Sequence, residues 1–305
     1  MTSPVPSHWG FASSLLLATA CWGLATVMTK GVLMHVPPLT LLIVELAVSL
    51  IFLWDIALVQ RVRMPLNKEA LRLGLIGLLN PGLAYTLSLI GLTLTTASMA
   101  TLIWAAEPIL ILGLAWLILR ERLTQPLVAL SGLAILGVVL VAGISANSVD
   151  ANALFGNLLV LGGVLCCALY TVLTRRAGAP FDPLVSVALQ QTFALVWALL
   201  IWPLELRNGG MASLAAIRPN DWAWAAASGI VYYALAFWFY LTGLKRTSAS
   251  LAGLFLNLIP IFGVGGAYLF LGERLRAAQW AGAILILAAT VAVLRLPRSG
   301  VLAQP

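Results

Sequence analysis

One stretch of this chain occurs twice, and the second copy lies 152 positions after the first. The first copy covers residues 95–122 and reads TTASMATLIWAAEPILILGLAWLILRER. The second covers residues 247–274 and reads TSASLAGLFLNLIPIFGVGGAYLFLGER, so the alignment has no gap and pairs Pro108 with Pro260. An internal repeat predicts two similar folded units, and this constrains the architecture more than any single motif does.

The composition identifies the class of protein. Of the 305 residues, 62% are hydrophobic and only 9% are charged, whereas roughly a quarter of a soluble domain is charged. Such a chain cannot cover a water-facing surface, so we predict an all-α integral membrane protein. The net charge of +7 is then a matter of topology rather than of nucleic-acid binding.

A membrane-spanning helix needs about 20 apolar residues. Read with that length, the sequence predicts ten spanning segments: 9–33, 38–59, 70–91, 96–119, 126–144, 153–173, 184–206, 221–243, 248–271 and 277–296. The first segment is expected to be retained, because no basic region or cleavage site typical of a signal peptide precedes it.

The repeat extends over both halves of the chain. Cys21 aligns 145 positions on with Cys166, and Pro38 aligns with Pro183. We therefore expect a short N-terminus (1–8), a first repeat (9–145), a second repeat (152–296) and a C-terminal tail (297–305). Five helices per half place the second half upside down relative to the first. Inverted repeats are typical of secondary transporters, although a duplicated channel or scaffold would carry one too.

Charge predicts the orientation. With the N-terminus inside, the inner segments hold twelve Lys and Arg residues and the outer segments hold five. Basic residues concentrate in cytoplasmic loops, so both termini are expected in the cytoplasm.

Polar and aromatic residues near the membrane centre are the candidates for substrate binding, because such groups face a cavity or a partner helix rather than lipid. They are Trp22, Asn80, Tyr85, Trp104, Glu107, Tyr170, Tyr232, Trp238 and Asn257. Three prolines are expected to break helices at similar depth: Pro81, Pro108 and Pro260.

Glu107 is the most unusual of these candidates. Trp104 lies three residues earlier, on the same helix face, and Pro108 lacks the N–H that would bond the Trp104 carbonyl. A carboxylate here binds an ammonium group, accepts a coupling proton or bonds a neighbouring helix, and the sequence leaves these three roles open. Asn257 lies three residues before Pro260. Pro260 also lacks an N–H, which leaves the Leu256 carbonyl without its helical partner.

Enzymatic signatures are absent from the sequence, which has no HExxH, GxSxG or Walker A pattern. His8 and His35 are too few and too far apart for a metal site. We expect neither an enzyme, a cofactor, a metal nor a nucleic-acid partner.

The sequence resembles the EamA-type members of the drug/metabolite transporter superfamily. The resemblance covers residues 9–296 and is carried by Cys21-Trp22-Gly23, by Pro108 followed by Arg120-Glu121-Arg122, and by GLKRTSAS (243–250) leading to Pro260 and Gly272-Glu273-Arg274. Among these proteins the chain is most similar to bacterial exporters of aromatic and other neutral amino acids. Many relatives carry an Arg in the second helix, where this chain has Glu45 and, in the repeat, Gln190.

The resemblance implies a multi-pass exporter of the bacterial plasma membrane, with a central cavity between the two halves. We expect alternating-access export of small metabolites, most of all aromatic and other neutral amino acids, with protons as an available coupling ion. Export of hydrophobic drugs or of another metabolite is the alternative within transport. A non-transporting membrane enzyme or assembly factor is the alternative outside it.

Overall fold

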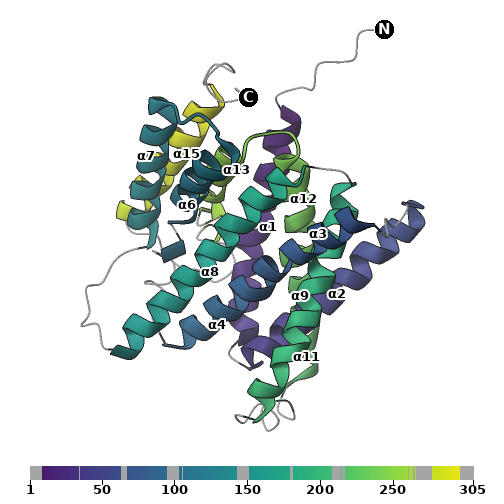
Figure 1. The fold of residues 1–305 in the computed structure, drawn as a ribbon. Helices are drawn as coiled ribbons and strands as arrows, with labels where there is room; N and C mark the ends of the chain where they lie inside the picture. Colours follow the sequence, from purple (N-terminus) through teal and green to yellow (C-terminus); the bar gives the residue numbers. More distant parts are fainter. Residues whose placement is uncertain are drawn as a thin grey trace.

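The computed structural model describes residues 9–33, 35–62, 67–94, 103–104, 106–142, 151–178, 181–207, 214, 217–259, 261–263, 265 and 277–295 (Figure 1). Within these residues the chain is helical and contains no strand. The N- and C-terminal segments predicted from the sequence lie outside the described residues, as do Pro260, Glu273 and Arg274.

The helices follow the ten predicted segments. The first half contains α1 (Trp9–Leu33), α2 (Pro38–Val59), α3 (Lys68–Ile76), η1 (Leu78–Leu83), α4 (Ala84–Leu94), α6 (Glu107–Leu114), η2 (Ala115–Leu119) and α7 (Gln125–Ala142). The second half contains α8 (Ala151–Arg176), α9 (Pro183–Glu205), α11 (Pro219–Ser228), η4 (Gly229–Leu235), α12 (Ala236–Leu244), α13 (Ala249–Leu256) and α15 (Ala277–Leu294). Among the described residues, five helices are long and apolar enough to cross a membrane, and five shorter apolar helices occupy the other predicted positions.

The two halves pack as an inverted repeat requires. The contact of α4 with α8 has its counterpart in the contact of α12 with α1, and α2 packs on α9 as α7 packs on α15. Two glycines 152 positions apart make equivalent close approaches: Gly77 lies against the backbone of Gln190, and Gly229 lies against the backbone of Glu45. The predicted all-α fold with a five-plus-five inverted repeat is confirmed.

The third and eighth helices are irregular at equivalent positions. Each contains a π-helical turn, η1 in the first half and η4 in the second. Asn80 within η1 has non-helical backbone angles (φ −148°, ψ 123°), and Pro81 follows it. π turns are frequently found at functional sites, and here they place Asn80 and its repeat partner Tyr232 at matching depths.

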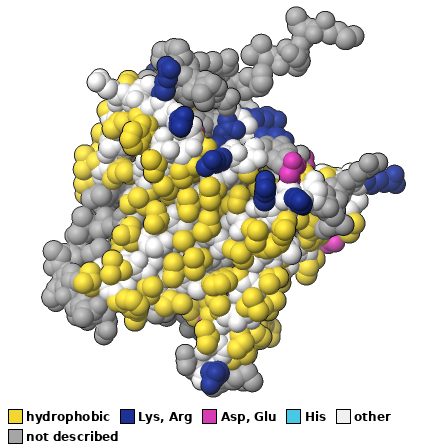
Figure 2. Space-filling model, in the orientation of Figure 1, with side chains coloured by type: hydrophobic (Ala, Val, Ile, Leu, Met, Phe, Trp, Pro, Cys, Tyr) yellow, Lys and Arg dark blue, Asp and Glu magenta, His cyan; other side chains and the backbone are white. Residues whose placement is uncertain are grey.

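The surface is that of a membrane protein. Figure 2 shows a broad apolar band across the visible face, while most of the Lys and Arg side chains on that face gather at one end. The same end of the molecule holds the start of α1 and the end of α15 (Figure 1). The chain thus begins and ends its membrane helices on one side, as an even number of crossings requires.

Candidate functional site

Three tyrosines and a tryptophan meet where the two halves face each other. The Tyr85 ring from α4 lies 5.7 Å from that of Tyr232 and 5.5 Å from that of Tyr233, both on η4. The Tyr85 hydroxyl donates a hydrogen bond of 3.1 Å to the Tyr232 hydroxyl. Trp104 lies on the other side of Tyr85, with 6.4 Å between ring centroids. Tyr85, Trp104 and Tyr232 were all predicted as binding residues, and the structure brings them together.

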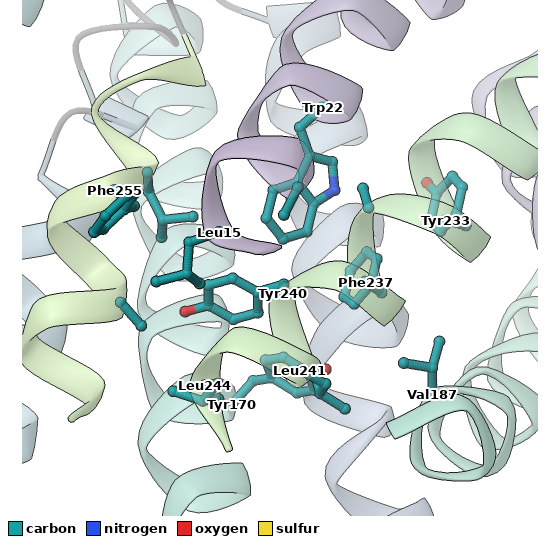
Figure 3. Packing of buried hydrophobic residues seen from close by; sticks show 14 of the residues in the cluster. Leu15, Trp22, Tyr170, Val187, Tyr233, Phe237, Tyr240, Leu241, Leu244 and Phe255 are labelled. Atoms are coloured by element: carbon teal, nitrogen blue, oxygen red, sulfur yellow. The ribbon is translucent and has the colours of Figure 1, made fainter. Parts of the chain in front are cut away.

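A second aromatic group continues from the first. Tyr233 stacks on Phe237 at 6.2 Å, and Phe237 lies 5.2 Å from Trp22 of α1 and 6.1 Å from Tyr170 of α8. Trp22 also lies 5.3 Å from Tyr240, and Figure 3 shows these rings converging from three different helices. The rings touch one another directly, so a substrate ring would enter by replacing these contacts.

Sequence reasoning missed Phe237 and Tyr240 of this second group. Together with Tyr233 they stand at spacings of four and three residues, which places all three side chains on one face of the eighth helix. That spacing was available in the sequence and marks the face that meets the first half of the chain.

Glu107 begins α6, where Pro108 occupies the first turn. Its side chain is 9% exposed. It interacts electrostatically with Cys167 of α8, and with Tyr232 and Tyr240 on the eighth helix. Within the part of the chain that the structure describes, no hydrogen bond and no basic side chain reaches its carboxylate. A buried carboxylate is costly unless it is paired or hydrogen-bonded, and the described residues supply no basic side chain to Glu107.

Two asparagines present buried oxygens without a hydrogen-bond partner. Asn80 and Asn257 are 7% and 2% exposed, and neither Oδ1 atom is bonded within the described residues. The Asn257 Nδ2 donates to the Leu254 carbonyl at 3.1 Å, two residues before the Leu256 carbonyl considered from the sequence. Both oxygens are acceptors to which the described residues supply no donor.

Tyr170 and Trp238 have no ring contact with Tyr85, Trp104 or Tyr232 within the described residues. The Tyr170 hydroxyl donates to the Gln190 Oε1 at 2.9 Å, so its polar group is already satisfied. Trp238 is half-buried and stacks on its neighbour Phe239 at 6.4 Å. The Tyr170 hydroxyl is therefore not free for the tyrosine cluster.

Glu45 of α2 lies in a polar cluster that adjoins Tyr233. Its Oε1 accepts hydrogen bonds from the Ser228 hydroxyl of α11 at 2.6 Å and from the Thr29 hydroxyl of α1 at 3.2 Å. The two hydroxyls lie 2.7 Å from each other. The repeat partner, Gln190, makes the corresponding contact with Thr174 at 3.2 Å. The same polar contact between neighbouring helices thus occurs in both halves, but only the first half has a carboxyl group in it.

One small cavity, of about 30 Å³, lies at the end of the molecule where α8 ends and α9 begins. It is lined by residues that include Arg175, Phe181 and Lys245. That volume suits about one water molecule, so it is not a site for a metabolite.

The chain matches the EamA-like transporter family twice, over residues 10–143 and again over residues 154–295. It is similar to the uncharacterized transporter YvbV of Bacillus subtilis (strain 168), with 30% identity over 285 residues that cover 90% of this chain and 88% of that protein.

It is also similar to a probable amino-acid metabolite efflux pump of Salmonella typhimurium (strain LT2), with 27% identity over 90% of this chain and 91% of the pump. A solved crystal structure superposes with a TM-score of 0.73 at 20% identity, covering 92% of this chain and 96% of the other. The structural likeness concerns the fold alone.

Proposed function

The chain belongs to the EamA-like transporter family, and we propose that it exports aromatic and other neutral amino acids by alternating access. It acts in this proposal as a secondary transporter without enzymatic activity. The similarity to a probable amino-acid metabolite efflux pump supports the class of substrate.

The observation that supports the proposal is the buried carboxylate of Glu107, to which the described residues supply no basic side chain. A charge in a water-poor site is stable when it is paired, and the α-ammonium group of an amino acid is a suitable partner. The unbonded oxygens of Asn80 and Asn257 are further acceptors for ammonium hydrogens.

The aromatic cluster supplies the second half of the recognition. Trp104 lies three residues before Glu107 in the chain, and its ring lies 6.4 Å from that of Tyr85. Stacked or edge-to-face ring pairs contribute about 0.5–1.5 kcal/mol beyond area burial. A substrate with an aromatic side chain and an ammonium group matches both features.

We place the protein in the bacterial plasma membrane with both termini in the cytoplasm. Most of the basic side chains visible in Figure 2 lie at the end where α1 begins and α15 ends. Basic residues favour the cytoplasmic side, and export then proceeds away from that end.

Tracer flux in proteoliposomes that contain only the purified protein tests the proposal. Radiolabelled L-phenylalanine should exchange across the membrane, and unlabelled neutral amino acids should compete with it. Trp104→Ala and Glu107→Ala should abolish this flux while the purified proteins remain folded by circular dichroism. Normal flux in both variants would remove this site assignment. Competition by hydrophobic drugs but not by amino acids would instead favour drug export, which the apolar aromatic cluster also suits.

A further inference from the structure

We propose that Glu45 is the site that binds the coupling proton, so that export exchanges one substrate molecule for one inward-moving proton. The inference rests on the proposed transport function. It assigns the proton to a residue distinct from Glu107, which is kept for the substrate.

The hydrogen count around Glu45 indicates a proton. Three oxygens, from Glu45, Thr29 and Ser228, lie in a closed triangle with contacts of 3.2, 2.7 and 2.6 Å. Each contact needs one hydrogen, but two hydroxyl groups supply only two. A proton on the carboxyl group supplies the third hydrogen and completes the ring.

The site is buried and tightly packed. The Glu45 side chain is 2% exposed. The backbone of η4 packs directly on the backbone of Glu45, since a Cβ placed on Gly229 would lie 2.6 Å from the Glu45 carbonyl oxygen. An ammonium group or a metal ion would need this packing to open, whereas a proton adds no volume.

The repeat partner shows what the same position does without a titratable group. Gln190 accepts from the Tyr170 hydroxyl at 2.9 Å and donates to Thr174 at 3.2 Å, so every contact has its own hydrogen. An amide therefore meets the structural need of this helix contact. The carboxyl group at Glu45 adds the ability to gain and lose a proton, and it does so in one half only.

The position of Glu45 links its protonation to the movement of the halves. Glu45 and Thr29 belong to the first half, whereas Ser228 belongs to the second. Protonation forms an O–H bond and removes the charge, and it completes the ring that joins α1, α2 and α11. Release of the proton leaves one of the three contacts without a hydrogen. The two hydroxyls then face a charged Glu45 carboxylate, and hydrogen bonds to a charged group are stronger than those to a neutral one. Proton binding and release thus change the strength of a contact across the moving interface.

No basic side chain among those described contacts Glu45, so its charge is open to change. The hydroxyl of Tyr233 on η4 also interacts with the Glu45 carboxyl group, and Tyr232 interacts electrostatically with the same group. On α1, Lys30 follows Thr29, but its side chain is outside the described set. The remaining ionisable groups on the elements packed against this site are Cys21 on α1, Tyr85 on α4, Asp55 on α2, Asp221 on α11 and Glu205 on α9.

The test uses purified full-length protein in proteoliposomes, with two readouts for each variant. Counterflow of labelled against unlabelled L-phenylalanine at equal pH reports substrate binding and movement. Accumulation driven by an imposed pH gradient reports coupling, since a gradient of about one pH unit supports up to about tenfold accumulation in a one-to-one exchange. The variants are Glu45→Gln, which copies Gln190, Glu45→Asp, which keeps a carboxyl group, and Asp55→Asn, an exposed carboxylate on the same helix.

We expect Glu45→Gln to keep counterflow and lose gradient-driven accumulation, while Glu45→Asp and Asp55→Asn keep both. Gradient-driven accumulation by Glu45→Gln at the wild-type level would overturn the inference. Wild-type counterflow without any response to the gradient would also overturn it and leave the proposed function intact. Absence of all L-phenylalanine flux in the wild type would instead contradict the proposed function. If Glu45→Gln does not fold, Ser228→Ala is measured in its place. Loss of gradient-driven accumulation with counterflow retained in Ser228→Ala supports the inference. Unchanged accumulation in Ser228→Ala contradicts it.

Discussion

The carboxylate of Glu121 accepts two hydrogen bonds from Ser250, one from the Ser250 backbone N–H at 3.2 Å and one from the Ser250 hydroxyl at 2.5 Å. The N–H of Ala249 donates a third, at 2.9 Å. Glu121 follows the fourth membrane helix, and Ala249 begins the ninth, so the bond joins repeat-related helices from the two halves. Glu121 therefore caps the start of a helix other than the one that it follows.

Glu121→Ala is expected to destabilise the protein by about 1–2 kcal/mol, because helix-start N–H groups lose their acceptor. Thermal unfolding of the detergent-purified protein measures the effect. Arg122→Ala, a change of the exposed neighbouring residue, serves as the control and should stay within about 0.5 kcal/mol. Equal stabilities for the two variants would contradict the capping role.

The positions of the helices could be predicted from the sequence, because apolar runs and helix-starting prolines are local signals. Pro38 and Pro183 each occupy the first turn of the helix expected there. The inverted repeat could also be predicted, since it follows from an alignment and an odd number of helices.

Contacts between helices could not be predicted in the same way. Glu121 and Ala249 are 128 residues apart, and no local pattern pairs them. The hydroxyl of Tyr170 looked free for a substrate in the sequence, but packing gives it Gln190 as a partner. Which side chains meet depends on helix crossing and rotation, and these are set by side-chain packing over the whole bundle.

Gly77→Ala and Gly229→Ala should each destabilise the protein by about 1–3 kcal/mol, as overpacking of a tight contact does. A methyl group at Gly77 would overlap the backbone of Gln190, and one at Gly229 would press on that of Glu45. Gly132→Ala is the matched control, because nothing lies within 4 Å of its added methyl group. It should stabilise the helix by about 0.5–1 kcal/mol. Loss of stability in Gly132→Ala to the same extent would show that the repeat-related contacts are not special.

Tyr170→Phe is expected to lower stability by about 1 kcal/mol, since the Gln190 Oε1 loses a buried donor. The ring and its contact with Phe237 remain, so the KM for L-phenylalanine should stay unchanged. Unfolding in detergent and flux in proteoliposomes measure the two effects separately. A higher KM with unchanged stability would mean that the hydroxyl serves the substrate instead.

The hydroxyl pair Tyr85 and Tyr232 joins the third and eighth helices across the repeat interface. A double-mutant cycle of Tyr85→Phe and Tyr232→Phe should give a coupling of about 0.5–1.5 kcal/mol in kcat/KM, the net worth of one hydrogen bond. The same cycle with Tyr85→Phe and Tyr170→Phe is the control, because these hydroxyls have no contact in the described structure. Additive effects of Tyr85→Phe and Tyr232→Phe would exclude a shared role in transport.

The most direct test of the account compares three ring compounds in the same proteoliposomes. L-Phenylalanine has an ammonium group and a carboxylate, 3-phenylpropionate lacks the ammonium group, and phenethylamine lacks the carboxylate. The account predicts that L-phenylalanine flux is inhibited by phenethylamine but not by 3-phenylpropionate. Equal inhibition by both compounds in the wild-type protein would contradict recognition of the ammonium group by Glu107.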